Sequence, residues 1–131
     1  MAKEMIHPDN VYVAPNHILA CRVGKTVYIG GHGATAPDGT LVGKDNIEAQ
    51  ATQAFINLSN ILKASGASLG DIVKLNIYLT AQEHLSTMIG VRTKFFAEQK
   101  APLPPGRTTV IVKSLGNPDS LIEIEGIAEI D

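Results

Sequence analysis

Two segments that each carry a single apolar stripe constrain the fold of this chain more than any other feature. The first runs from Asp45 to Gly66 and the second opens at Thr80, and in both the stripe recurs at three- and four-residue steps. The stripe residues are Ile47, Ala51, Ala54, Phe55, Leu58, Ile61 and Leu62, then Leu85, Met88, Ile89, Arg92, Phe95 and Phe96. This periodicity predicts two helices, with Asp45-x-x-Glu48 and Thr80-x-x-Glu83 as capping boxes. Because each helix has one apolar side, both should cover the same face of one sheet.

Runs of β-prone residues supply the strands of that sheet. The runs His17–Val23 and Thr26–Gly30 flank Gly24-Lys25, an arrangement that is typical of a β-hairpin. Alternation of apolar and polar residues predicts a half-buried strand over Ile72–Thr80. The other expected strands are Arg107–Lys113, Leu121–Ile130 and a short return at Thr40–Val42, whereas residues 1–16 are expected to form a lead-in segment. This order of elements predicts an α+β fold.

The last expected strand has two chemically different sides. Ile122, Ile124, Ala128 and Ile130 lie on one side, and Glu123, Glu125, Ile127 and Glu129 lie on the other. We expect the isoleucine side to meet the helices. The glutamate side, with Arg107, Thr109, Ile111 and Lys113 of the neighbouring strand, should form a polar sheet face. Such a face can be left to water or buried against a partner subunit.

Composition limits the classes of function that the chain can serve. Its 131 residues fit one domain, 1–131. The net charge of -2 and the absence of a basic run argue against nucleic-acid binding. The single cysteine, Cys21, cannot form an internal disulfide, which favours a reducing compartment. No apolar run approaches a membrane span and no leader pattern is visible, so we expect a cytoplasmic protein.

Several motif-like stretches do not predict a cofactor or metal site. Gly31–Ala36 matches a dinucleotide-binding pattern, but a Pro37-Asp38-Gly39 turn follows it where a helix would be needed. The four histidines have no ligand spacing and no cysteine partner, so we expect neither metal nor cofactor. Cys21 lies in a strand run without a visible base and is interpreted as a structural thiol.

The most informative polar residues are Arg107, at the start of a strand, and the glutamates of Ile122–Ala128. An arginine can hold a carboxylate in a two-pronged hydrogen bond, and a glutamate can orient and deprotonate water. A surface ion pair between adjacent strands would explain the same residues. The pattern alone leaves both interpretations open.

Several stretches resemble the Rid family (RidA/YjgF-type imine and enamine deaminases). The resemblance extends from about residue 12 to residue 130. The similar stretches are Gly24–Gly31, Asp45–Gln53, Asn57–Gly66, Gly70–Thr80, Pro105–Val110 and Ile122–Ala128. The resemblance implies a chorismate-mutase-like fold, with one mixed sheet of about five to six strands and two helices on one face. It also implies a homotrimer with clefts between subunits. The activity it implies is cofactor-independent hydrolytic deamination of 2-imino or enamine acids, releasing ammonia and a 2-oxo acid.

The resemblance also implies roles for individual residues. Arg107 would clamp the carboxylate of a small substrate, and Glu123 would position the attacking water. Backbone groups near Gly31 and Thr109 would complete the cleft. His32 could donate a proton to the leaving amine, although an exposed loop histidine without a role would fit the sequence equally.

The chain departs from the family pattern around this pocket. Asn16 and His17 follow Ala14-Pro15 where deaminating members usually carry a tyrosine, and Gly30 and His32 replace a serine and a glutamine. Ile89 stands where an asparagine is common. The alternatives are therefore a non-catalytic trimeric module that binds small carboxylates, or a deaminase of a bulkier aminomuconate-type substrate. RNA cleavage, which has been ascribed to relatives, is disfavoured by the acidic charge.

Overall fold

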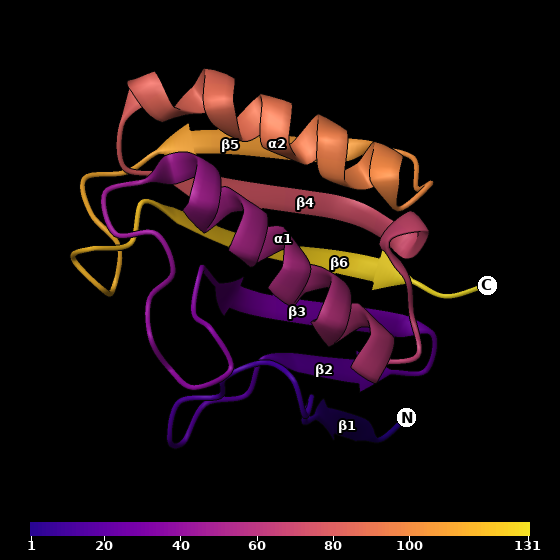
Figure 1. The fold of residues 1–131 in the computed structure, drawn as a ribbon. Helices are drawn as coiled ribbons and strands as arrows, with labels where there is room; N and C mark the ends of the chain where they lie inside the picture. The colour runs from indigo at the N-terminus through magenta and orange to yellow at the C-terminus, as the bar shows by residue number, and fades with distance from the viewer.

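A six-stranded mixed sheet with two helices on one side forms the protein (Figure 1), and the computed structural model describes all of residues 1–131. The strands are β1 Lys3–Ile6, β2 Ala20–Val23, β3 Thr26–His32, β4 Ile72–Leu79, β5 Gly106–Ile111 and β6 Ile122–Glu129. The helices are α1 Ile47–Ala64 and α2 Leu85–Glu98, with short 3-10 turns η1 Leu69–Asp71 and η2 Gln82–His84. The predicted α+β class, with about six strands, is therefore confirmed.

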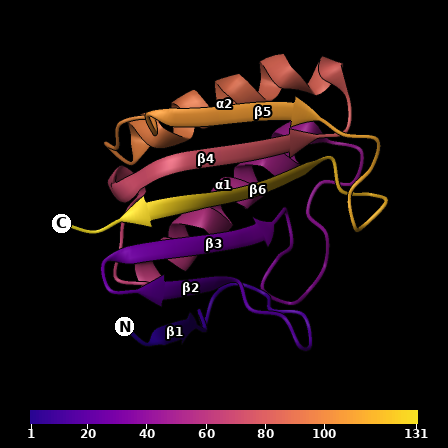
Figure 2. The same cartoon turned by 180° about the vertical axis from the view of Figure 1, so that it is seen from behind.

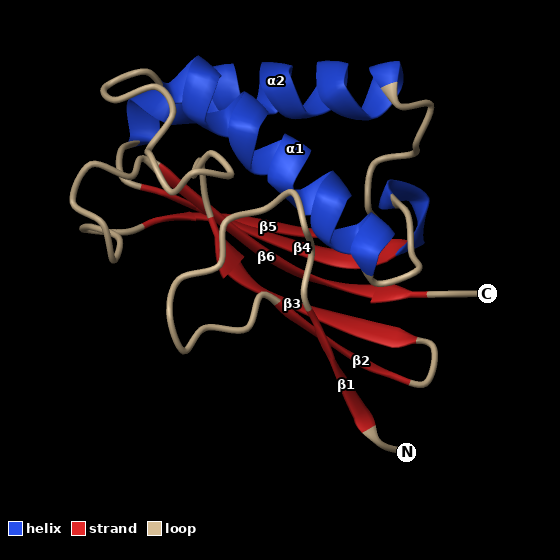
Figure 3. Cartoon of the chain, turned by 60° about the horizontal axis from the view of Figure 1, so that its bottom comes forward, coloured by secondary structure: helices blue, strands red, loops and turns tan.

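The order of strands across the sheet is β1-β2-β3-β6-β4-β5. All neighbouring pairs are antiparallel except β4 and β5, which are parallel because α2 provides the crossover between them. Both helices cover the same face (Figure 3), and the opposite face is free of helices (Figure 2). We call this second face the open face. It is the surface on which the polar residues of β6 lie.

The apolar stripe of α1 packs on the helix side of the sheet as its periodicity predicts. Phe55, Leu58, Ile61 and Leu62 are fully buried. They share one core with the buried residues of β4 and β6, namely Leu75, Ile77, Leu79, Ile122, Ile124 and Ala128. The predicted alternation is therefore confirmed for β6 and for β4 from Lys74 onward, and its polar half lies on the open face. Val73, expected on the buried side, is 44% exposed because the pairing with β6 shifts register between Ile72 and Lys74.

The N-terminal segment contains a strand that the sequence reading missed. β1 pairs antiparallel with β2, with Lys3 opposite Val23 and Ile6 opposite Ala20. Only Ile6 is buried in this edge strand, so its sequence shows no two-sided pattern. The strand expected at Thr40–Val42 was wrong, because that loop makes only an isolated bridge between Thr35 and Leu41.

Both predicted capping boxes were also wrong. Asn46 is the N-cap of α1, and its side chain accepts a hydrogen bond of 3.0 Å from the N–H of Ala49. Asp45 instead has a left-handed φ of 60°. After Thr80 the chain first forms the 3-10 turn η2, and α2 begins at Leu85 without a side-chain cap.

The prediction that Arg107 and Thr109 share a face with Glu123 was wrong. β5 pairs with β4 and not with β6, and its register places Arg107 beside Leu75 and Thr109 beside Ile77. Paired residues on adjacent strands point to the same side of a sheet, and Leu75 and Ile77 are buried under the helices. Ile111 follows the same phase. The crossover through α2 places β5 at the sheet edge, an arrangement that strand patterns alone do not reveal.

Candidate active site

Glu123 lies on the open face of β6, in the middle of the sheet and half-buried. Its nearest neighbour on β3 is Gly31, where an added Cβ atom would lie 2.8 Å from the Glu123 Oε1 atom. Any larger residue at this position would therefore force the carboxylate of Glu123 to shift. Burial raises the pKa of Glu123, the negative charge of Glu125 raises it further, and His17 opposes the rise. No hydrogen bond is among the influences on this pKa.

Glu125, two residues along the same face, is held in a different way. The hydroxyl of Tyr78 and the Nδ2 of Asn76 both donate to its Oε1 atom, and the Asn76 bond is 3.2 Å long. The hydrogen bond to Glu125 is also the main cause that raises the Tyr78 pKa. One carboxylate is thus fixed by donors, while the other remains available for proton transfer. Paired groups in contrasting environments are typical of acid–base sites.

His17 is an additional residue near Glu123 to which the sequence reading gave no role. Asn16 adopts a left-handed φ of 63°, and the N–H of His17 donates to the carbonyl of Ala14 at 3.1 Å. This turn leaves the His17 side chain exposed. His17 and Gly31 both line one small hollow of about 150 Å³. A histidine directly after a Pro-Asn turn, next to a predicted pocket strand, was the available sequence clue.

His32 does not lie beside Glu123. It pairs with Ile124 of the core, is only 8% exposed, and places its Nδ1 atom 3.1 Å from the carbonyl of Gly30. Its Nε2 atom has no hydrogen-bond partner within 3.5 Å, and burial lowers its pKa despite contacts with the Gly30 and Ala54 backbone. The interpretation as an exposed loop histidine is therefore also wrong. The imidazole packs between the sheet and α1, where it also lines the small hollow shared by His17 and Gly31.

Arg107 and Thr109 lie on the helix side of the edge strand β5. The Arg107 side chain is exposed, and its Nη1 atom donates a hydrogen bond of 2.7 Å to the carbonyl of Pro104. This bond fixes the direction of the guanidinium. Two strand spacings, roughly 10 Å, and the thickness of the sheet separate Arg107 from Glu123 of the same chain. The two residues can therefore meet on one small ligand only if they come from different copies of the chain.

The open face carries an apolar groove of about 650 Å³ beside the glutamates. The groove is lined mainly by hydrophobic side chains, among them Met5, Ile18, Cys21, Val23, Tyr28 and Ile127. Tyr28 is 50% exposed and Met5 is 45% exposed in the single chain. An apolar area of this kind on a sheet face is typical of a protein–protein contact.

The chain has no group of three or more His, Cys, Asp or Glu side chains arranged to hold a metal ion. Neither of its helices combines the length and the hydropathy required to cross a lipid bilayer.

The fold and the glutamate site define a small α+β protein of the YjgF type. Residues 8–130 match the family model described as Endoribonuclease L-PSP. The chain therefore belongs to this family, which includes the RidA and YjgF proteins. Its recognition from sequence is confirmed.

Individual relatives agree with this assignment. A RutC family protein of Pyrococcus abyssi is 34% identical over 132 residues, with 98% of each chain covered. The 2-iminobutanoate/2-iminopropanoate deaminase of Salmonella typhimurium is 34% identical over 112 residues, covering 86% of this chain and 85% of that protein. The crystal structure of Escherichia coli TdcF with bound serine superposes with a TM-score of 0.90, at 28% identity, covering 98% of this chain and 99% of TdcF.

Proposed function

We propose that this protein is a hydrolytic deaminase of 2-imino or enamine acids, releasing ammonia and a 2-oxo acid. The observation that carries the proposal is the Glu123 carboxylate, which lies against Gly31 with a raised pKa and beside a fixed second carboxylate. A carboxylate in this state can accept a proton near neutral pH more readily than an ordinary surface glutamate. The deaminase activity that names relatives such as the Salmonella protein supports the same chemistry.

Arg107 is the proposed anchor for the substrate carboxylate. Its guanidinium is oriented by Pro104 and leaves further N–H groups free for a two-pronged contact. Because β5 is an edge strand, the outer backbone groups near Thr109 pair with no other strand of this chain. These groups complete the proposed substrate contact. The serine bound to TdcF supports the binding of a small amino or imino acid in this family.

The proposed reaction needs only water and three proton transfers. Glu123 accepts a proton from water as the water oxygen attacks the protonated imine carbon, which gives a tetrahedral amino alcohol. The amine then takes up a proton, the carbon–nitrogen bond breaks and ammonia leaves, while the hydroxyl loses its proton and becomes the 2-oxo group. His17, which is exposed and close enough to influence the pKa of Glu123, is the proposed proton donor to the amine. Positioning of water and imine supplies much of the rate.

The site proposed here is shared between subunits of a homotrimer. Arg107 and Glu123 lie on opposite faces in one chain, so a complete site needs one residue from each of two copies. The apolar groove on the open face supports burial of this face against a second copy. Closed cyclic assemblies are the common way to repeat such a contact.

A coupled ammonia-release assay tests the proposal. Imines would be generated in situ by an amino-acid oxidase from a panel of amino acids, and ammonia release would be compared with and without the protein. We expect acceleration over spontaneous hydrolysis, and its loss in Glu123→Gln. Absence of acceleration over the whole panel, with carboxylate binding retained, would overturn the deaminase and leave a binding module.

A further inference from the structure

Arg92 is a charged residue inside the apolar stripe of α2. The stripe positions before and after it, Met88 and Phe96, are 0% and 1% exposed, and Arg92 itself is only 9% exposed. Its Nε atom is buried and has no hydrogen-bond partner. Arginine is rarely buried unless a carboxylate or another acceptor satisfies it. The contacts within the chain therefore do not explain why a charged residue is buried under α2.

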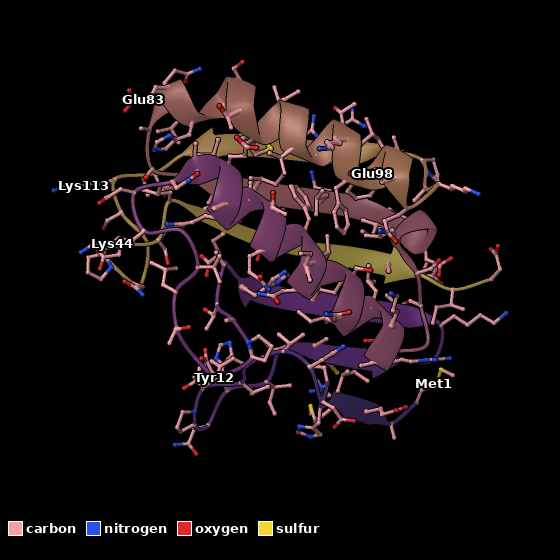
Figure 4. All side chains as sticks on the ribbon, in the orientation of Figure 1. Met1, Tyr12, Lys44, Glu83, Glu98 and Lys113 are labelled. Carbon is pink, nitrogen blue, oxygen red and sulfur yellow. The ribbon has the colours of Figure 1, made fainter.

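Arg107 lies at the same level under α2 and on the same side of the sheet. Arg107 pairs with Leu75, which lies four residues before Leu79, the end of β4, or about 13 Å along the strand. From Leu85, at the start of α2, Arg92 is seven residues along, about 10 Å along the helix. Glu83, in the 3-10 turn before α2, and Glu98, the last residue of α2, mark the two ends of this segment in Figure 4. Arg92 is the eighth of the 14 residues of α2 and therefore lies at the middle of the helix. In Figure 1 α2 lies in front of β5 and runs roughly along it.

The Arg92 guanidinium lies within electrostatic reach of Arg107, and no carboxylate of the chain neutralises it. Burial lowers the pKa of Arg92 first, and the positive charge of Arg107 lowers it further. No carboxylate is among the groups that shift this pKa. Arg107 donates to a neutral carbonyl, that of Pro104. Two adjacent positive charges without an acidic partner repel each other, and an anionic ligand would remove this repulsion.

One carboxylate needs only one of these arginines. The planar fork of Arg107 matches both oxygens of a single carboxylate, so Arg92 would keep an uncompensated charge beside a ligand with one acidic group. We propose that Arg92 and Arg107 together bind a substrate with two acidic groups, the imine or enamine of a dicarboxylic acid. This inference rests on the proposed function, since it names the class of substrate for the same site.

Two 2-oxo acids of equal length provide the test. 2-Oxopentanoate and 2-oxoglutarate both have five carbons and a 2-oxo acid head, and they differ in the second carboxylate. Binding would be measured by calorimetry on the unmodified protein, Arg92→Met, Arg92→Lys and the control Lys94→Met. Lys94 is exposed on the same helix, so its removal changes the net charge equally without touching the arginine pair.

We expect 2-oxoglutarate to bind at least about tenfold more tightly than 2-oxopentanoate, as for one added charge-assisted contact. Arg92→Met should abolish this preference and leave the 2-oxopentanoate affinity within about threefold. Arg92→Lys should retain part of it, and Lys94→Met should retain all of it. Arg92→Met should fold, because replacing an uncompensated buried charge by an apolar residue of similar length is often stabilising.

Three results would overturn the inference. The first is an unmodified protein that shows no preference for the diacid, a result that depends on no variant. The second is an equal loss of both ligands in Arg92→Met, which would mean that one carboxylate bridges both arginines. The third is a preference that Arg92→Met leaves unchanged. Ammonia release is measured separately, so a diacid preference without turnover would refute the deaminase alone, and turnover without the preference would refute this inference alone.

Discussion

Arg107 and Glu123 lie on opposite faces of one sheet, with β4 between their strands. The two residues most suited to carboxylate binding and proton transfer are therefore held apart within a chain. They can meet only when two copies of the chain associate, with the edge strand of one copy beside the open face of the other. The proposed intersubunit site therefore makes activity depend on assembly.

Subunit mixing tests this coupling directly. Arg107→Ala and Glu123→Gln should each be inactive alone, since each removes one half of every site. After the two variants are unfolded and refolded together, about a quarter of the sites should contain both native residues, because the partners assort at random in a ring. Ammonia release should recover to about that fraction of the unmodified rate. If the mixture stays as inactive as its components, the site lies within one chain.

The two glutamates of β6 should respond differently to loss of charge. Glu123→Gln should lower kcat by roughly 10²-fold or more, the usual contribution of a general base. Activity requires ionised Glu123, so it should fall on the acidic side of a pKa that lies above that of an ordinary glutamate. Glu125→Gln removes a negative charge that raises this pKa, so the acidic limb of kcat/KM should move to lower pH. An unshifted limb in Glu125→Gln would mean that another group titrates.

The close contact between Gly31 and Glu123 predicts that Gly31→Ala lowers the rate by displacing the Glu123 carboxylate. In Gly31→Ala the new methyl group would lie 2.8 Å from the carboxylate oxygen, so the carboxylate must move. A displacement of about 1 Å can cost roughly 10²-fold in rate. Gly116→Ala is the matched control, since nothing lies within 4 Å of its added Cβ atom. Equal kcat values for the two variants, measured by ammonia release, would show that Glu123 is not the base.

Local sequence patterns predicted which helices and strands form better than they predicted which strands lie side by side. The stripe of α1, the positions Met88, Arg92 and Phe96 of α2, and the alternation of β6 follow directly from burial on one side. Ile89, expected in the stripe of α2, is instead 40% exposed. The partner of β5 could not be inferred in that way, because a parallel crossover fixes the strand order through the whole connection and not through the strand itself. The shared face expected for Arg107 and Glu123 failed for this reason. His32 failed for a different one, since a β-bulge between Ile29 and His32 shifts the phase of β3.

His17 offers a further test of the proton path. If it returns the proton to the leaving amine, His17→Gln should lower kcat about tenfold or more and change KM little. His84→Gln, in the turn before α2, is the control for removing a histidine. A rise in KM without a fall in kcat would assign His17 to ligand binding.

Buried His32 should make the folded protein sensitive to acid. Its folded pKa is lowered below the reference value of 6.5, because burial disfavours the charged ring. Below about pH 6.5 the unfolded chain takes up a proton at this position and the folded chain does not, so the free energy of unfolding falls by up to about 1.4 kcal/mol per pH unit until the folded pKa is reached. Above pH 6.5 both states are neutral at this position and the contribution vanishes.

Urea unfolding of the unmodified protein and of His32→Leu at pH 7.5 and 5.5 checks this prediction, with exposed His7→Leu as the control. His32→Leu should lose less stability on acidification than the other two proteins, whatever its stability at pH 7.5. An identical loss in all three would mean that His32 takes up its proton equally well in the folded state.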